Sequence, residues 1–193
     1  SKIRNLNPRL KPDPMTSAPC DTTLAAPPLA ISDRLATGVA WGLLGLLFVT
    51  NVPLFLCMPI IDDAALWGLH AQALLDGGVP YRDVLETNPP GTLWLYVAIR
   101  SLLGGSSVAL RAVDLAIFGT VVLLLLQIVK DVGVTKTVRV WTGAVCWLFY
   151  FSMSEWCHCQ RDMWLMVPSL GWVWLRGRQL RRLSREEPCP ASR

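Results

Sequence analysis

Two polar constellations interrupt an otherwise strongly apolar sequence. The first begins with the adjacent carboxylates Asp62 and Asp63 and continues through the turn Tyr81-Arg82-Asp83. In a partly dry pocket at a membrane surface, a carboxylate can accept a proton from an acceptor hydroxyl while a phosphate leaves a sugar carbon. The structural alternative is that Asp62 and Asp63 open a helix over residues 64–75, where they would satisfy free amides and the helix dipole. The turn itself is also explained by a local ion pair, which contributes little when it is exposed.

The second constellation runs from Glu155 to Asp162 between two apolar segments. Its Arg161 could clamp a phosphate with two parallel hydrogen bonds, with Gln160 and Asp162 beside it. The alternative for Arg161 is snorkelling to the interface or pairing with Asp162. The run Cys157-His158-Cys159 offers metal ligands, but it lacks the paired spacing of a structural zinc site. We therefore predict no metal ligands here.

Arg111 and Asp114 form a third candidate group at the start of an apolar segment. They lie three residues apart, which puts them on one helical face and within reach of each other. Ionisable groups at membrane depth usually face protein or a cavity, so this pair is expected to point inward. Arg111 is retained as a candidate phosphate ligand.

The composition indicates a membrane protein. Of the 193 residues, 52% are hydrophobic and nine are tryptophan, which is unusual for a soluble domain. The net charge of +4 does not indicate a nucleic-acid partner, because the basic residues flank apolar blocks and do not form one face. The six cysteines are scattered and show no disulfide framework, and the tryptophans are typical of an interfacial belt.

A helix needs about 20 apolar residues to cross a bilayer core of roughly 30 Å. Four segments approach this length, so the predicted fold is an all-α, polytopic transmembrane helical bundle. The last two segments are shorter than the first two and are the weaker candidates. The segments are 38–58, 109–129, 140–153 and 163–175.

Residues 92–103 form a fifth apolar stretch that is short and contains Arg100, so it either spans the membrane or lies on its surface. The surface placement puts fourteen of the eighteen Lys and Arg residues on the inner side, as the positive-inside tendency prefers. It also puts both polar constellations on the outer face. We therefore predict a multi-pass protein of the inner or plasma membrane with a cytoplasmic N-terminus.

The predicted organisation has three parts. A disordered, Pro-rich cytoplasmic tail covers residues 1–37, and a basic cytoplasmic tail covers 178–193. Between them, the transmembrane module 38–177 carries an outer acidic loop at 59–108.

The first constellation also carries a family resemblance. Asp63-Ala-Ala-Leu-Trp, the segment Ala73-Leu-Leu-Asp-Gly-Gly-Val-Pro-Tyr-Arg-Asp-Val and Asn88-Pro-Pro-Gly together resemble the first outer loop of bacterial C-type (GT-C) glycosyltransferases. These enzymes are similar to dolichyl-phosphate-mannose protein mannosyltransferases. Cys159-Gln-Arg-Asp with Pro168 resembles a later Gln-Arg-Glu element of the same group, with Asp162 replacing the common Glu. The resemblance covers roughly residues 38–175.

The resemblance implies a multi-span helical fold and an inverting transfer from a polyprenyl-phosphate-linked sugar on the outer face. It places the catalytic base at Asp63, with Asp62 as its neighbour. The elements Tyr81-Arg82-Asp83 and Gln160-Arg161-Asp162 would line the donor phosphate and sugar. No cofactor is predicted, and a divalent cation is left open.

The chain is shorter than the enzymes that it resembles, which continue through many more spans. A downstream chain completing the fold is therefore an expected partner together with the lipid bilayer, and activity of this chain alone is not expected. The alternative function is a non-catalytic remnant or accessory subunit of the same fold. A transporter or channel component ranks lower, because the charges lie mainly at the ends of the apolar segments.

Overall fold

The described part of the chain, in a computed structural model, comprises residues 32–85, 88 and 90–186. All regular secondary-structure elements in that part are helices. The only β-bridge there joins Pro80 to Val84. The all-α prediction is thus confirmed for these residues. Residues 1–31 of the predicted N-terminal tail and residues 187–193 of the C-terminal tail lie outside them.

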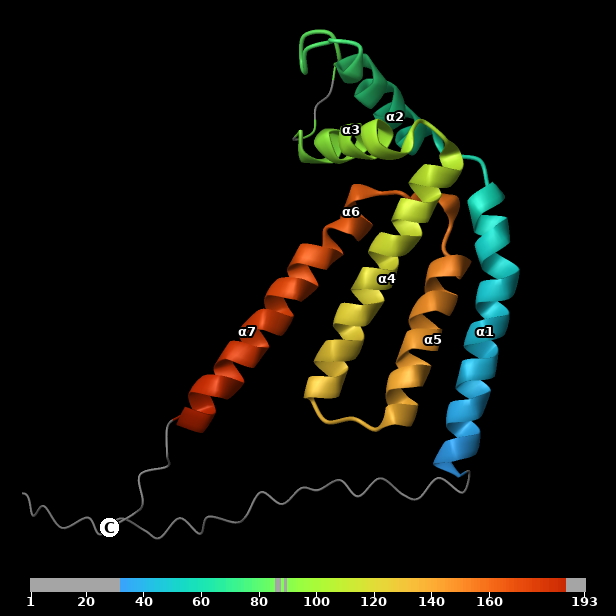
Figure 1. Cartoon of the computed structure of the whole chain (residues 1–193), viewed down its shortest axis with the longest axis vertical. Coiled ribbons are helices and arrows are strands. Elements are labelled where there is room, and N and C mark those ends of the chain that lie inside the picture. The colour runs from blue at the N-terminus through green and yellow to red at the C-terminus, as the bar shows by residue number, and fades with distance from the viewer. Residues whose placement is uncertain (1–31, 86–87, 89, 187–193) are drawn as a thin grey trace, which may run out of the picture. The chain divides into compact units, whose positions relative to one another are not determined.

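Four long helices, two shorter ones and two single-turn segments make up the described part of the fold (Figure 1). The long helices are α1 (Asp33–Cys57), α4 (Ser107–Asp131), α5 (Lys136–Ser152) and α7 (Met166–Glu186). Helix α4 contacts α1, α5 and α7, and α1 also packs along α5. The shorter α2 (Asp62–Leu75) and α3 (Gly91–Leu103) pack on each other, and α3 contacts α4. The turn η1 (Glu155–Cys157) and the short α6 (Arg161–Trp164) lead from α5 into α7.

Polar residues mark where three of the long helices begin. The side chains of Ser32, Ser106 and Thr135 each accept a hydrogen bond from the backbone N–H three residues later. Such caps satisfy amides that have no partner within the helix. The apolar segments that follow therefore start as helices at defined residues.

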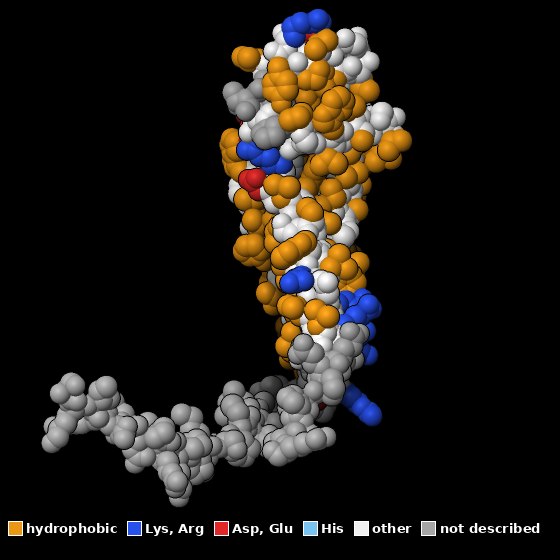
Figure 2. All heavy atoms as spheres, turned by 90° about the vertical axis from the view of Figure 1, so that its left-hand side faces the viewer, with side chains coloured by type: hydrophobic (Ala, Val, Ile, Leu, Met, Phe, Trp, Pro, Cys, Tyr) orange, Lys and Arg blue, Asp and Glu red, His pale blue; other side chains and the backbone are white. Residues whose placement is uncertain are grey.

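Two described helices, α1 and α4, are long and apolar enough to cross a membrane by length and composition. Only 11% and 22% of their apolar windows are buried, so most of the apolar surface of both helices is exposed. Figure 2 shows hydrophobic side chains spread along one face of the molecule. Both helices agree with predicted segments, although α1 begins at Asp33 and so includes residues that were assigned to the N-terminal tail.

The C-terminal boundary differs more from the prediction. Helix α7 extends to Glu186, so residues 178–186 of the predicted basic tail are helical. The reason is local, because Arg, Gln and Leu favour helix and no proline occurs between Pro168 and Pro188. The predicted segment 163–175 is also interrupted at Leu165, between α6 and α7.

Aromatic rings form the core shared by α1, α4 and α5. The ring of Phe118 stacks on that of Tyr150, with centroids 3.9 Å apart, and Trp147 meets Phe118 edge-on at 5.0 Å. Phe55 of α1 closes the cluster, with its ring centroid 5.8 Å from that of Tyr150. Offset and edge-on contacts of this kind stabilise a core beyond the burial of area alone. They hold α4 against α5 directly below the polar segment 155–164.

This packing predicts that Phe118→Ala will lower the free energy of unfolding by roughly 3–5 kcal/mol, the usual cost of removing a buried aromatic ring. The side chain of Phe118 is only 5% exposed. Thermal unfolding of the purified protein in detergent measures the change. Leu123→Ala on the same helix is the matched control, because Leu123 is 61% exposed. Equal effects of the two substitutions would contradict the packing described here.

Candidate functional site

The carboxylate of Asp114 lies at the centre of a buried polar network. Asp114 sits on α4 and has no exposed surface. The hydroxyl of Tyr150 and the backbone N–H of Cys159 donate to its Oδ2, the latter at 2.9 Å. The indole Nε1 of Trp164 donates to its Oδ1 at 2.7 Å. One side chain thereby joins α4 to α5, to the loop after η1 and to α6.

Tyr96 of α3 holds the same loop from another direction. Its hydroxyl donates to the carbonyl of Cys159 at 2.8 Å, and its ring stacks on Trp164 with centroids 5.5 Å apart. Cys159 has a φ of 57°, a left-handed conformation that costs a residue with a side chain about 1–2 kcal/mol. Both its backbone groups are bonded to buried partners, which hold it in that conformation. The segment from Cys159 to Trp164 is therefore fixed at both ends.

The electrostatics of this cluster keep its donors protonated. Burial raises the pKa of the Cys159 thiol, and the negative charge of Asp114 adds to the rise. Burial is also the main cause of the raised pKa of Tyr96, and the negative charge of Asp114 adds to the rise.

The two predicted catalytic aspartates lie in the first turn of α2, and both are exposed. The residue at the N-cap position is Ile61, which offers no side-chain hydrogen bond. The carboxylates are thus placed at the positive end of a helix, as the structural alternative requires. They also remain open to solvent and to a substrate, as the catalytic role requires.

The Tyr81-Arg82-Asp83 element forms a closed local turn. Arg82 donates to Asp83 with an N–O distance of 2.7 Å, and the Val79 N–H donates to Asp83 at 2.8 Å. These bonds lower the pKa of the Asp83 carboxyl, with Arg82 as the main cause. Tyr81 is left-handed at φ 63°, and its hydroxyl donates to the Asn88 carbonyl at 3.1 Å. The exposed turn therefore contains the local ion pair between Arg82 and Asp83 that the sequence analysis gave as its structural explanation.

Arg111 is buried as expected, but its partners differ from the predicted one. Its Nε donates to the Met58 carbonyl at 3.0 Å, and its Nη2 donates to the Pro59 carbonyl. Its guanidinium carbon lies 4.8 Å from the ring centroid of Phe55. No ion pair joins Arg111 to Asp114 in the part of the chain that the structure describes. Because α1 ends at Cys57, the carbonyl groups just beyond it accept no hydrogen bond from a following helical turn. Arg111 donates to them instead.

Arg161 lines an open groove of about 800 Å³. Its guanidinium is 39% exposed, and its Nε lies 3.6 Å from the carboxylate of Asp162, which is itself 85% exposed. Gln160, at the N-cap of α6, is half-buried. Asn88 adds a second polar group to the wall, and most of the remaining wall is apolar. The apolar wall residues are Leu95, Ile117, Trp164, Leu165, Val167 and Pro168.

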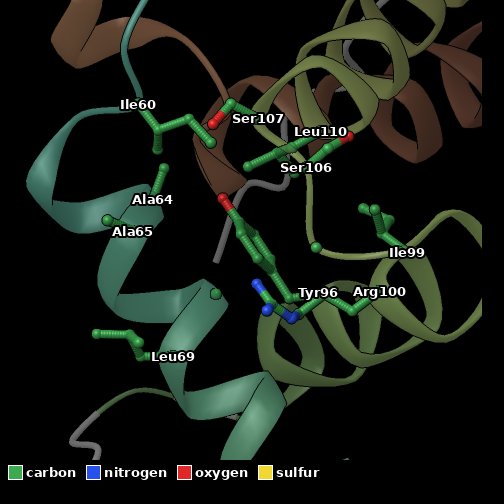
Figure 3. A pocket seen from close by; sticks show the side chains of 13 residues that line it. Ile60, Ala64, Ala65, Leu69, Tyr96, Ile99, Arg100, Ser106, Ser107 and Leu110 are labelled. Atoms are coloured by element: carbon green, nitrogen blue, oxygen red, sulfur yellow. The ribbon is translucent and has the colours of Figure 1, made fainter.

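A second pocket of about 280 Å³ lies between α2, α3 and the start of α4 (Figure 3). Arg100 reaches across it toward α2 and donates to Gln72 Oε1 from Nε at 3.3 Å and from Nη2 at 3.2 Å. A Cβ on Gly105 would lie 2.6 Å from Nη2 of Arg100, and one on Gly68 would lie 3.3 Å from Nη1. The two glycines therefore make room for an arginine that ties α2 to α3.

The structure thus separates the predicted site residues into groups. Arg161 lies on the groove, while neither the Tyr81-Arg82-Asp83 turn nor Arg111 contributes to the described part of its wall. Asp63 lies on α2, which packs on α3, and the α3 residue Tyr96 stacks on the groove residue Trp164. Sequence reasoning did not identify Tyr96, Tyr150 and Trp164, whose spacings from Asp114 carry no motif.

No group of three or more potential metal ligands occurs among residues 32–85, 88 and 90–186. No family model, curated protein or solved structure matches the chain. The function is therefore inferred from the residues and their arrangement.

The network predicts that Asp114→Asn will destabilise the protein strongly. An asparagine presents an amide N–H₂ either to Tyr150 and Cys159 or to Trp164, so a donor meets a donor in each orientation. Each hydrogen bond lost to a charged group costs about 1.5–3 kcal/mol. Unfolding in detergent measures the loss, with the exposed Asp162→Asn as the matched control. A variant at position 114 as stable as this control would contradict the network.

Proposed function

We propose that this chain is the membrane module of a glycosyltransferase that moves a sugar from a polyprenyl-phosphate carrier to an acceptor hydroxyl on the non-cytoplasmic face. The observation that carries the proposal is the groove, in which an apolar wall and one guanidinium occur together. A prenyl chain needs an apolar wall, and its phosphate needs a cation. The proposal also rests on the family resemblance of the two polar constellations.

The groove fits the donor in the following way. Leu95, Ile117 and Pro168 belong to three different helices and offer the prenyl chain an apolar surface. Arg161 is exposed enough to present its planar guanidinium to a phosphate, which it can bind with two parallel hydrogen bonds. Asp162 is too exposed to neutralise Arg161 strongly, because exposed pairs contribute little. The positive charge of Arg161 therefore remains available to an anionic ligand.

The transfer would proceed by direct displacement. Asp63 accepts the proton of the acceptor hydroxyl while the acceptor oxygen forms a bond to the anomeric carbon of the sugar. The bond from that carbon to the phosphate oxygen breaks with inversion, and polyprenyl phosphate leaves with the electron pair. Arg161 stabilises the negative charge that the phosphate gains. Asp62 is the neighbouring carboxylate, and Gln160 and Asp162 border the sugar.

The helices that carry Asp63 and Arg161 are linked by packing and by one hydrogen bond. Asp63 lies in the first turn of α2, which packs on α3, and the hydroxyl of Tyr96 on α3 donates to the carbonyl of Cys159, two residues before Arg161. The donor phosphate and the acceptor hydroxyl would meet near this cluster. Tyr96 itself remains protonated and serves as a structural donor.

The membrane arrangement is part of the proposal. Helices α1, α4, α5 and α7 cross an inner or plasma membrane, and the N-terminus is cytoplasmic. Helices α2 and α3 lie at the outer interface, where their polar ends meet water. A downstream chain would complete the fold and supply further acceptor contacts.

The donor site can be tested on this chain alone. We expect Arg161→Gln to weaken binding of undecaprenyl phosphate to the purified protein by about 10- to 100-fold, the value of a charge-assisted hydrogen bond. Arg161→Lys should recover part of the affinity, because it keeps the charge and loses the planar fork. Arg82→Gln is the control, since Arg82 is not among the residues of the groove wall. Unchanged binding by Arg161→Gln would exclude the groove as the phosphate site.

The chemical step needs a separate experiment. In the protein co-expressed with its downstream chain, Asp63→Asn should abolish sugar transfer while leaving undecaprenyl-phosphate binding unchanged, because the amide cannot accept the proton. Asp76→Asn, at the other end of α2, is the matched control and should retain activity. Full transfer by Asp63→Asn would remove Asp63 as the base. Donor binding without transfer by the wild type would favour the accessory-subunit alternative.

A further inference from the structure

Helices α1 and α5 begin, and α4 and α7 end, at the same end of the bundle (Figure 1), and basic residues occur close to these four helix ends. Two contacts show that these helix ends meet. The hydroxyls of Thr37 and Thr137 lie 2.8 Å apart between α1 and α5, and Arg181 of α7 donates to Asp131 of α4 at 2.6 Å. Eight Lys and Arg residues and two Asp residues with described side chains lie there. The basic ones are Arg34, Lys130, Lys136, Arg139, Arg176, Arg178, Arg181 and Arg182.

The net charge of this end is therefore +6 within the described side chains. The other end, which carries α2, α3 and the loop before α6, has the opposite balance. Its six exposed acidic residues outnumber the three arginines that are not fully buried, Arg82, Arg100 and Arg161. The exposed acids are Asp62, Asp63, Asp76, Asp83, Glu155 and Asp162. The basic end therefore carries the net positive charge that attracts anions.

Tryptophans accompany the basic residues on the same helices. Trp172 and Trp174 precede Arg176 on α7, and Trp141 follows Arg139 on α5. The Trp172 ring is 68% exposed, and the guanidinium of Arg178 lies over the Trp174 ring, 5.0 Å from its centroid. Exposed tryptophan beside arginine is typical of the headgroup level of a bilayer, where the ring lies among lipid and the charge lies in water. A nucleic acid would not require this order of apolar helix, tryptophan and arginine.

We propose that the basic end of the bundle, defined by the eight Lys and Arg residues named above, is a binding surface for anionic phospholipid headgroups. Arg181 is paired with Asp131, so the contacts come mainly from Arg176, Arg178 and Arg182 on α7 and from Lys130 at the end of α4. Each basic side chain near an anionic leaflet contributes to binding, and the attraction falls with ionic strength. This inference rests on the proposed membrane arrangement but not on the proposed sugar transfer, so loss of transfer in Asp63→Asn would leave it unaffected.

The test compares lipid retention by the purified chain. Native mass spectrometry counts molecules of phosphatidylglycerol and of zwitterionic phosphatidylcholine that remain bound after detergent exchange. The wild type should prefer phosphatidylglycerol, and the triple substitution Arg176→Gln, Arg178→Gln and Arg182→Gln should reduce that preference by roughly fivefold for each charge removed. The same three positions changed to Lys should keep the preference. The ion pair of Arg181 with Asp131 is left intact in both variants.

Single substitutions provide a matched control. Arg178→Gln and Arg82→Gln each remove one exposed guanidinium, and only the first should lower the preference for phosphatidylglycerol. The proposal is overturned if the triple Gln variant retains the wild-type preference, or if the triple Lys variant loses it. It is also overturned if single-stranded RNA binds the protein in phosphatidylcholine nanodiscs as tightly as phosphatidylglycerol does. Thermal unfolding of each variant shows whether a loss of binding reflects a loss of folding.

Discussion

A carboxylate with no exposed surface must be surrounded by donors, and this requirement organises one end of the molecule. Asp114 accepts hydrogen bonds from Tyr150, Cys159 and Trp164, which reach it from α5, a loop and α6. Removing any of these donors would leave a buried charge partly uncompensated. Because the donors belong to separate segments, the chain can satisfy Asp114 only when all of these segments are in place. The position of Arg161, between two of the donors, follows from the same requirement.

The buried and half-buried arginines follow a related rule. Arg111 supplies hydrogen bonds to carbonyls that the end of α1 leaves without partners, and Arg100 occupies the space that Gly68 and Gly105 leave open. Each connects two helices, so its charge serves the fold. Arg161 differs, because its nearest carboxylate is exposed and it faces a groove. An arginine in this protein therefore either connects helices or remains available to a ligand. Which of the two applies depends on whether backbone or side-chain acceptors already surround its guanidinium.

The sequence predicted the helices far better than their contacts. Apolar length identified α1 and α4, and the short apolar stretch at 92–103 proved to be the separate helix α3. Local turn chemistry likewise predicted the ion pair of Arg82 with Asp83. The partners of Asp114 could not be predicted, because they lie 36, 45 and 50 positions away and share no periodicity with it. Helix α7 continues through the first part of the predicted basic tail, because arginine is a good helix former.

The two ends of the bundle impose constraints that agree with each other. A buried polar network such as that around Asp114 is stable only where helices converge and exclude solvent, and the loops that supply its donors must leave the apolar region nearby. Basic residues, in contrast, need no partner from the protein, because water and headgroups can surround them. The chain therefore has its buried polar network at one end and most of its exposed cations at the other. In the proposed membrane arrangement, α2, α3 and the groove of Arg161 lie on the side of the bilayer away from these cations.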